Sequence, residues 1–87
     1  MSTAATDEPE GFYSELERNW LVYPISERKD HGAWYEVGSA GVDGIVFAIR
    51  KDQEGVYAFY PIDREFIRKA DDLSALVVGW RSGSITV

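Results

Sequence analysis

Two pairs of carboxylates lie close together in the sequence and are the first candidates for acid–base chemistry. Asp52 and Glu54 share one polar segment, and Asp63 and Glu65 share another. A carboxyl group that acts as a general acid needs a raised pKa, which an apolar pocket or a second nearby carboxylate provides. Both pairs fall at predicted turns, where water solvates the carboxylates. We therefore expect neither pair to perform acid–base catalysis.

His31 is the single histidine of the chain and the remaining candidate for proton transfer. It lies in a charged segment, 26–32, which favours a surface position over a catalytic one. No serine lies in the Gly-x-Ser-x-Gly sequence of a nucleophile elbow. A catalytic triad that includes His31 is the alternative, but the sequence names no partners for it. We predict that the protein is not an enzyme.

The sequence offers little for a metal ion or a phosphate. The chain has no cysteine, and one histidine is too few for a multi-histidine site. Asp43, Asp71 and Asp72 could together hold a cation, but helix capping explains Asp71 without a metal. The glycine-rich segment 38–44 lacks the Gly-Lys-Ser/Thr end of a phosphate-binding loop and precedes a strand, so a hairpin loop is expected. We predict no metal and no cofactor.

Three runs in the middle of the chain predict a β-meander that would position these residues. Residues 45–50 alternate between apolar side chains on one side and mixed side chains on the other, which is the period of a strand. Residues 56–60 are aromatic and β-branched, and residues 65–70 form a third run with Phe66 and Ala70 expected on one side. Polar turns separate the three runs.

Two amphipathic helices are predicted, one on each side of the meander. In residues 7–20, Phe12, Leu16 and Trp20 recur at helical spacing after Asp7 as the N-cap. In the second helix, which follows Asp71 and ends before Gly83, the apolar side chains also recur at helical spacing. That stripe consists of Leu73, Leu76, Val77 and Trp80.

These elements predict one two-layer α+β domain over residues 7–87, after a disordered leader at 1–6. An antiparallel sheet of four to five strands is expected to carry the N-terminal and the C-terminal helix on one face. Residues 33–37 would add a strand, residues 21–25 an edge strand or connector, and residues 84–87 either a last strand or a frayed end.

The aromatic residues exceed what one face of a small sheet can bury. Some of them are therefore expected on the second face, where exposed Trp and Tyr favour a binding surface or a homodimer interface. The predicted partner-binding residues are three aromatic residues and three acids in neighbouring loops. They are Trp34, Tyr57, Phe59, Asp43, Asp52 and Glu54.

Charge and hydropathy restrict the partners. The 87 residues include 15 acids and 9 bases, a net charge of −6, which disfavours nucleic acid and anionic membranes and favours a basic protein surface. No apolar run approaches the roughly 20 residues of a membrane span, and the N-terminus has no basic region followed by an apolar one. We expect a cytoplasmic location.

Three segments resemble the C-terminal half of SUKH superfamily domains. They read DGIVFAI, GVYAFY and EFIRKADDLSALVVGW, and they lie within residues 43–80. SUKH proteins include bacterial immunity proteins against secreted toxins. The resemblance implies a partner-binding module without catalytic residues. The expected function is a small acidic protein-binding module, immunity-like under this resemblance, with a structural homodimer and a small enzyme as alternatives.

Overall fold

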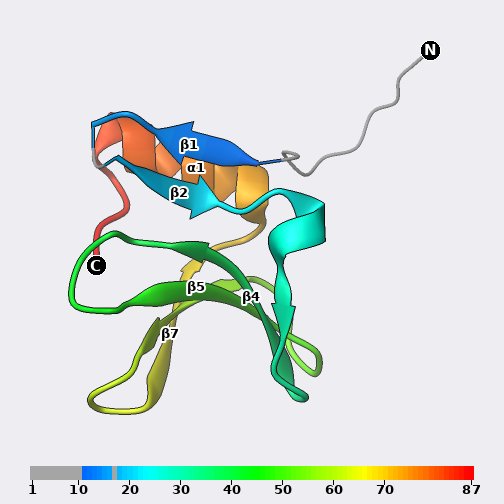
Figure 1. Ribbon diagram of the computed structural model, residues 1–87. Coiled ribbons are helices and arrows are strands. Elements are labelled where there is room, and N and C mark those ends of the chain that lie inside the picture. The colour runs from blue at the N-terminus through cyan, green and yellow to red at the C-terminus, as the bar shows by residue number, and fades with distance from the viewer. Residues whose placement is uncertain (1–10, 17) are drawn as a thin grey trace.

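The computed structural model describes residues 11–16 and 18–87 of the chain. In chain order the elements are β1 (Phe12–Ser14), β2 (Asn19–Val22), the short 3₁₀ helix η1 (Ile25–Glu27), β3 (Lys29–Asp30), β4 (Trp34–Ser39), β5 (Val46–Arg50), β6 (Val56–Tyr60), β7 (Glu65–Ala70) and α1 (Leu73–Ser82). Strands β3 to β7 form a five-stranded antiparallel sheet in chain order, and β1 and β2 form a separate two-stranded sheet (Figure 1).

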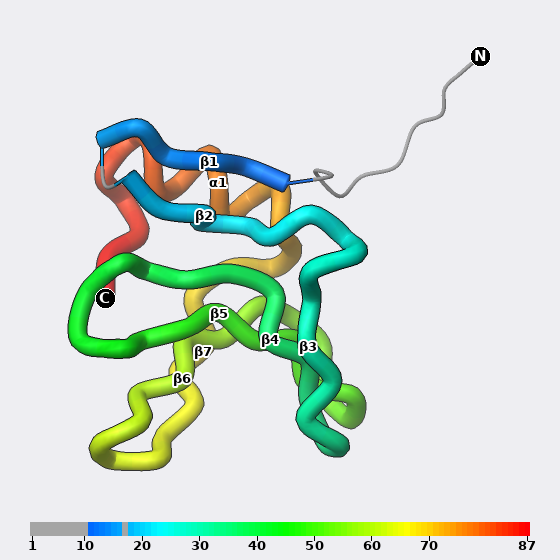
Figure 2. Tube along the Cα trace, in the orientation of Figure 1, coloured from blue at the N-terminus to red at the C-terminus, as the bar shows by residue number. Residues whose placement is uncertain are grey.

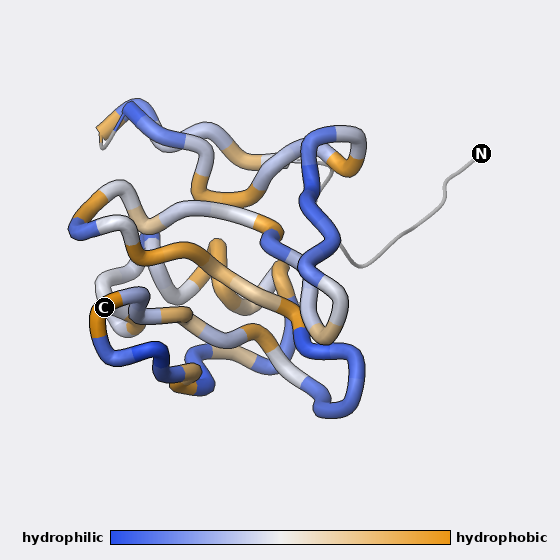
Figure 3. Tube along the Cα trace, turned by 60° about the horizontal axis from the view of Figure 1, so that its bottom comes forward, coloured by the Kyte–Doolittle hydropathy of each residue, from blue (hydrophilic) through white to orange (hydrophobic). Residues whose placement is uncertain are grey.

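The predicted meander is confirmed as strands β5, β6 and β7. Strands β5 and β6 are mostly apolar, whereas the turns that follow them are mostly hydrophilic, as the hydropathy colours show (Figure 3). The expectation that Phe66 and Ala70 share a side is wrong. Tyr57 pairs with Arg68 while its neighbour Val56 pairs with Ala70, so β7 has one extra residue at this point. This bulge turns Ala70 toward the core.

The predicted N-terminal helix is wrong for the described residues, which form a β-hairpin instead. Tyr13 pairs with Trp20 across β1 and β2, and Arg18 in the turn has a φ of 54°. Leu16, expected on the apolar face of a helix, is 90% exposed in that turn. Phe12, Leu16 and Trp20, which have helical spacing in the sequence, therefore lie on the first strand, in the turn and on the second strand of this hairpin. The proposed N-cap Asp7 and the expected leader at 1–6 lie outside the described residues.

Strand β2 is held in place by its close approach to β4. The backbone N–H of Tyr23 donates to the carbonyl of Val37 at 2.7 Å, and the Asn19 side chain donates to the carbonyl of Ser39 at 2.6 Å. A Cβ atom at Gly38 would collide with the carbonyl oxygen of Leu21, so only glycine permits this packing distance. The long-range contact with β4 decides the conformation of residues 19–23, and local helix propensity does not.

Helix α1 forms where the sequence predicts it, with a different cap. The Asp72 carboxylate, and not that of Asp71, accepts a hydrogen bond from the Ala75 N–H at 2.8 Å. Gly83 ends the helix with a φ of 85°, as expected. Leu73 and Leu76 are fully buried, and the Trp80 ring meets Phe47 of β5 edge-on at 5.8 Å. The helix therefore covers the sheet through its predicted stripe.

Within residues 11–16 and 18–87 the fold is mostly β, with two sheets and one C-terminal α-helix, so the predicted α+β architecture with two helices on one face is wrong. The hairpin β1–β2 and α1 lie together beside the five-stranded sheet (Figure 2) and enclose the core. Residues 84–87 form no strand. Among the described residues, no helix has the length and apolarity needed to cross a membrane.

Candidate functional site

Four aromatic side chains gather on the face of the sheet that points away from α1. We call Trp34, Tyr57, Phe59 and Phe66 the aromatic face. The ring centroid of Trp34 lies 5.2 Å from that of Phe59 and 5.4 Å from that of Phe66. Phe59 and Phe66 are 4.9 Å apart and pair directly across β6 and β7. Tyr57 is buried, whereas the other three rings keep part of their surface open.

The aromatic face is concave. Trp34 lies on β4 and Phe66 on β7, with two strands between them. In a flat sheet, strands three positions apart are separated by about 14 Å, yet these two rings are 5.4 Å apart. Ala48 of β5 lies between Glu36 and Tyr57 in the register and is fully buried. Its small side chain leaves room for the rings of the outer strands to close over the middle of the sheet.

Two arginines border the aromatic face and are paired with acids of the same chain. The Arg50 guanidinium lies 4.7 Å from the Phe66 ring centroid and 5.8 Å from that of Tyr57, and its Nε is 3.8 Å from Asp52. Arg68, directly opposite Tyr57, pairs with Asp71 at 2.9 Å. Cation–π contact restrains Arg50 over the rings, and the acids offset both positive charges.

A buried carboxylate forms a polar network beside the rings. Glu36 is only 9% exposed. Its Oε2 accepts a hydrogen bond from the Tyr23 hydroxyl at 2.8 Å, and its Oε1 lies 3.0 Å from His31 Nε2. Lys29 Nζ is 3.9 Å from Oε2. The His31 ring stacks on Trp34 with centroids 4.3 Å apart and planes 13° apart. The hydrogen bond to Glu36 therefore restrains the position of the His31 ring, and the stacked His31 ring covers one face of the Trp34 indole.

The network is arranged to hold its members in place. Burial and the neighbouring Glu36 carboxylate raise the pKa of Tyr23 to about 12. The phenol therefore remains protonated at neutral pH and serves as a hydrogen-bond donor. A nucleophile or base would need a lowered pKa at this position. Among residues 11–16 and 18–87, no three acidic or histidine side chains are grouped so that they could hold a metal ion.

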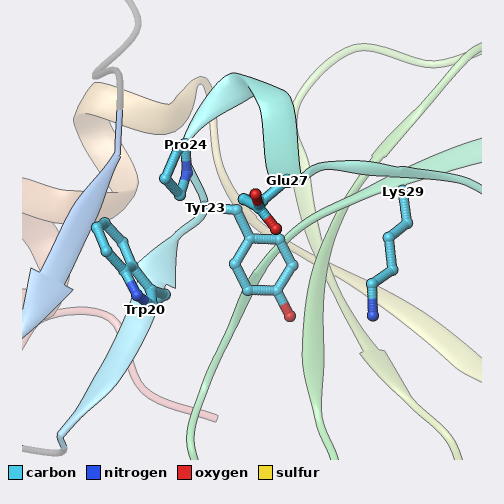
Figure 4. Close-up of a pocket in the computed structure, with 5 residues that line it drawn as sticks. All are labelled: Trp20, Tyr23, Pro24, Glu27 and Lys29. Atoms are coloured by element: carbon cyan, nitrogen blue, oxygen red, sulfur yellow. The ribbon is translucent and has the colours of Figure 1, made fainter.

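An open hollow of about 490 Å³ adjoins the network (Figure 4). The Trp20 ring lies on one side and Lys29 on the other, with Tyr23 between them. Pro24 and Glu27 complete the lining. One acid and one base line the hollow, so its walls provide no excess charge with which to select an ionic ligand.

The structure brings together three of the six predicted binding residues. Trp34, Tyr57 and Phe59 share the aromatic face. Asp43 lies in the loop before β5 and lines a separate hollow, whereas Asp52 and Glu54 lie in the loop after β5, at the opposite end of that strand. Asp43 therefore does not form one site with Asp52 and Glu54.

Sequence reasoning missed Phe66, Arg50, Glu36 and Tyr23 as members of the site. Strand alternation could have found Phe66 and Arg50, because both lie on strands that were predicted. Glu36 shares the Trp34 side of a predicted strand, opposite Tyr35, and an acid inside such a strand suggests a buried partner. No local signal links Tyr23 to Glu36, since the fold alone brings β2 to β4.

The sequence matches no protein-family model, and no significant match was found among curated proteins or solved structures. The resemblance to SUKH domains therefore stays a prediction.

Proposed function

We propose that this protein is a non-enzymatic binding module that recognises a basic polypeptide segment with its aromatic face. The observation that carries the proposal is the concave set of rings, which packs on the side of the sheet opposite α1 and is separate from the core cluster. Preformed aromatic surfaces lose little side-chain entropy on binding, and Trp and Tyr dominate the energy of many interfaces.

The fixed position of Trp34 supports a recognition role. Stacking on His31 holds one side of the indole, and Phe59 and Phe66 contact it from the sheet. The Glu36 network in turn restrains His31. A ring held on several sides presents a defined surface to a partner.

Charge supports a basic partner. The chain has a net charge of −6, and the two arginines beside the rings are offset by Asp52 and Asp71. An arginine or lysine of the partner could therefore approach the rings without strong repulsion and make cation–π contacts with them. Long-range attraction to the acidic chain would raise the association rate at low salt.

Two of the expectations above bear on this proposal. Under the SUKH resemblance the partner would be a secreted toxin, which co-expression with a toxin encoded by a neighbouring gene tests directly. The enzyme alternative has less support, because Tyr23 has a raised pKa and His31 is occupied by its carboxylate partner and by Trp34.

Affinity capture followed by binding measurements tests the proposal. Tagged protein would capture partners from native cells, and the purified partner would then be titrated by calorimetry. We expect Trp34→Ala to increase the dissociation constant by roughly tenfold or more, as hot-spot truncations do. Added salt should increase it further.

Trp20→Ala is the matched control, since Trp20 is 41% exposed and contacts Tyr13 of the hairpin. Circular dichroism would show that both variants remain folded. Equal affinity of the Trp34→Ala variant and the wild type, or equal losses in the two variants, would contradict the proposal.

A further inference from the structure

We propose that the outer edge of β7 pairs with β7 of a second copy of this chain, forming a symmetric antiparallel dimer. Strand β7 is the last strand of the five-stranded sheet, and no other described strand pairs with its outer side. Its inner side pairs with β6, and a strand of six residues offers enough outward-facing backbone groups to continue the ladder. This interface is separate from the proposed binding function of the aromatic face.

Symmetry restricts the register of such a pair. In a two-fold antiparallel ladder, the symmetry axis passes either through a residue, which then lies opposite itself, or between two neighbouring residues of the strand. Residues that lie opposite one another have their side chains on the same face of the sheet. Ile67 is opposite Ala58 in its own sheet, on the core face, whereas Phe66 is opposite Phe59, on the aromatic face. Only registers that place a residue opposite itself therefore keep the two core faces on the same side.

Pairing centred on Ile67 makes the edge self-complementary. Residue 65 then lies opposite residue 69 of the other copy, and residue 66 lies opposite residue 68. Glu65 meets Lys69 twice, and Phe66 meets Arg68 twice. Centring on Phe66 would instead bring Arg64 against Arg68, and centring on Arg68 would bring that arginine against itself. Charge complementarity selects the register centred on Ile67.

Two charged residues of this edge, Glu65 and Lys69, have no ion-pair partner within the described part of the chain. Lys69 Nζ lies 5.9 Å from the ring of Tyr60, which packs on the core, so Lys69 and Glu65 point to the same face. Four residues along a strand separate them by about 13 Å, so they pair between copies and not within one.

Apolar surface lies beside this edge. Ile67 is 40% exposed although it points to the core face, and α1, which contacts β7, leaves Val78 67% exposed. Pairing about Ile67 would cover two copies of that side chain and would join the two aromatic faces into one continuous surface. Because the contact is a single strand pair, we expect a dissociation constant on the order of micromolar.

Sedimentation equilibrium from low micromolar to near-millimolar concentration tests the dimer. The wild type should approach twice the chain mass of 9.8 kDa. Glu65→Lys and Lys69→Glu each place like charges opposite one another twice and should weaken the dimer by roughly tenfold. The double variant Glu65→Lys/Lys69→Glu should regain wild-type dimerisation.

Mixing the two single variants gives the sharpest readout. Lysines at 65 and 69 of one variant would face glutamates at 69 and 65 of the other, so the mixture should dimerise about tenfold more tightly than either variant does alone. Glu54→Lys, the same charge change in the loop before β6, is the control and should dimerise as the wild type does. A monomeric wild type, a mixture that does not associate, or equal weakening by the control would overturn the proposal.

Discussion

The two faces of the five-stranded sheet both carry aromatic rings, but they are covered in different ways. On the core face, Phe47 is fully buried under α1, where the Trp80 ring contacts it. On the aromatic face, Trp34, Phe59 and Phe66 cover one another and remain partly open. The same strands supply both sets through their alternation, so the difference comes from what packs over each face.

This difference separates stability from recognition. A ring covered by another element loses nearly all its contact with water and stabilises the fold by the full transfer energy. A ring that shares its cover with neighbouring rings contributes less and keeps surface for a partner. We therefore expect mutations on the core face to act mainly on folding and mutations on the aromatic face to act mainly on binding.

The largest expected effect compares one phenylalanine from each face. Phe47→Ala should lower the free energy of unfolding by about 3–5 kcal/mol, because it removes a fully buried ring and leaves a cavity. Phe59→Ala should cost about 1–2 kcal/mol, because its ring is only partly buried. Urea denaturation of both variants measures the two values. Equal losses of unfolding free energy in the two variants would show that the two faces contribute alike to stability.

An intermediate effect is expected at the polar network beside the aromatic face. Tyr23→Phe removes the hydrogen bond to Glu36 and should cost about 1.5 kcal/mol at neutral pH. The folded-state pKa of Tyr23, about 12, lies above its unfolded value of 10.0. Its stabilising contribution is therefore complete below pH 10 and is lost as pH rises toward 12.

Denaturation of both proteins across this alkaline range measures the effect. The stability difference between wild type and Tyr23→Phe should shrink as pH rises from 10 to 12. A difference that stays constant over this range would show that the hydroxyl does not titrate as the geometry implies.

The smallest expected effect concerns the start of α1, which covers the core face. Asp72→Ala should cost about 1 kcal/mol, because Asp72 caps the helix through the Ala75 N–H. Asp71→Ala should cost less than about 0.5 kcal/mol, because Asp71 makes only an exposed ion pair with Arg68. Thermal unfolding of the two neighbouring variants compares them. A larger loss for Asp71→Ala would restore the cap position predicted from the sequence.

Local patterns predicted the parts of the fold that local physics controls. The alternation in residues 45–50 and 56–60 predicted β5 and β6, and the apolar stripe of Leu73, Leu76 and Trp80 predicted the buried side of α1. Three of the aromatic-face residues were also predicted, because strand alternation fixes which side chains share a face.

The N-terminal segment shows where this reasoning fails. Phe12, Leu16 and Trp20 have the spacing of a helix, yet the structure has a hairpin whose second strand is held against β4 at Gly38. That contact joins residues far apart in the sequence, so a local pattern does not reveal it. The same long-range packing brings Tyr23 to Glu36 and so creates the polar network.

The sequence by itself determined the meander, the C-terminal helix and the alternation of side chains in β5 and β6, whereas the bulge in β7 was not predicted. These features depend on the intrinsic period of strands and helices and on turn residues such as Gly83. Only the tertiary structure decided that the N-terminal segment is a hairpin, that the sheet curves to bring Trp34 onto Phe66, and that β7 is left at an open edge. The physical reason is that the free energy of burying surface between distant segments exceeds the small local preferences of short segments.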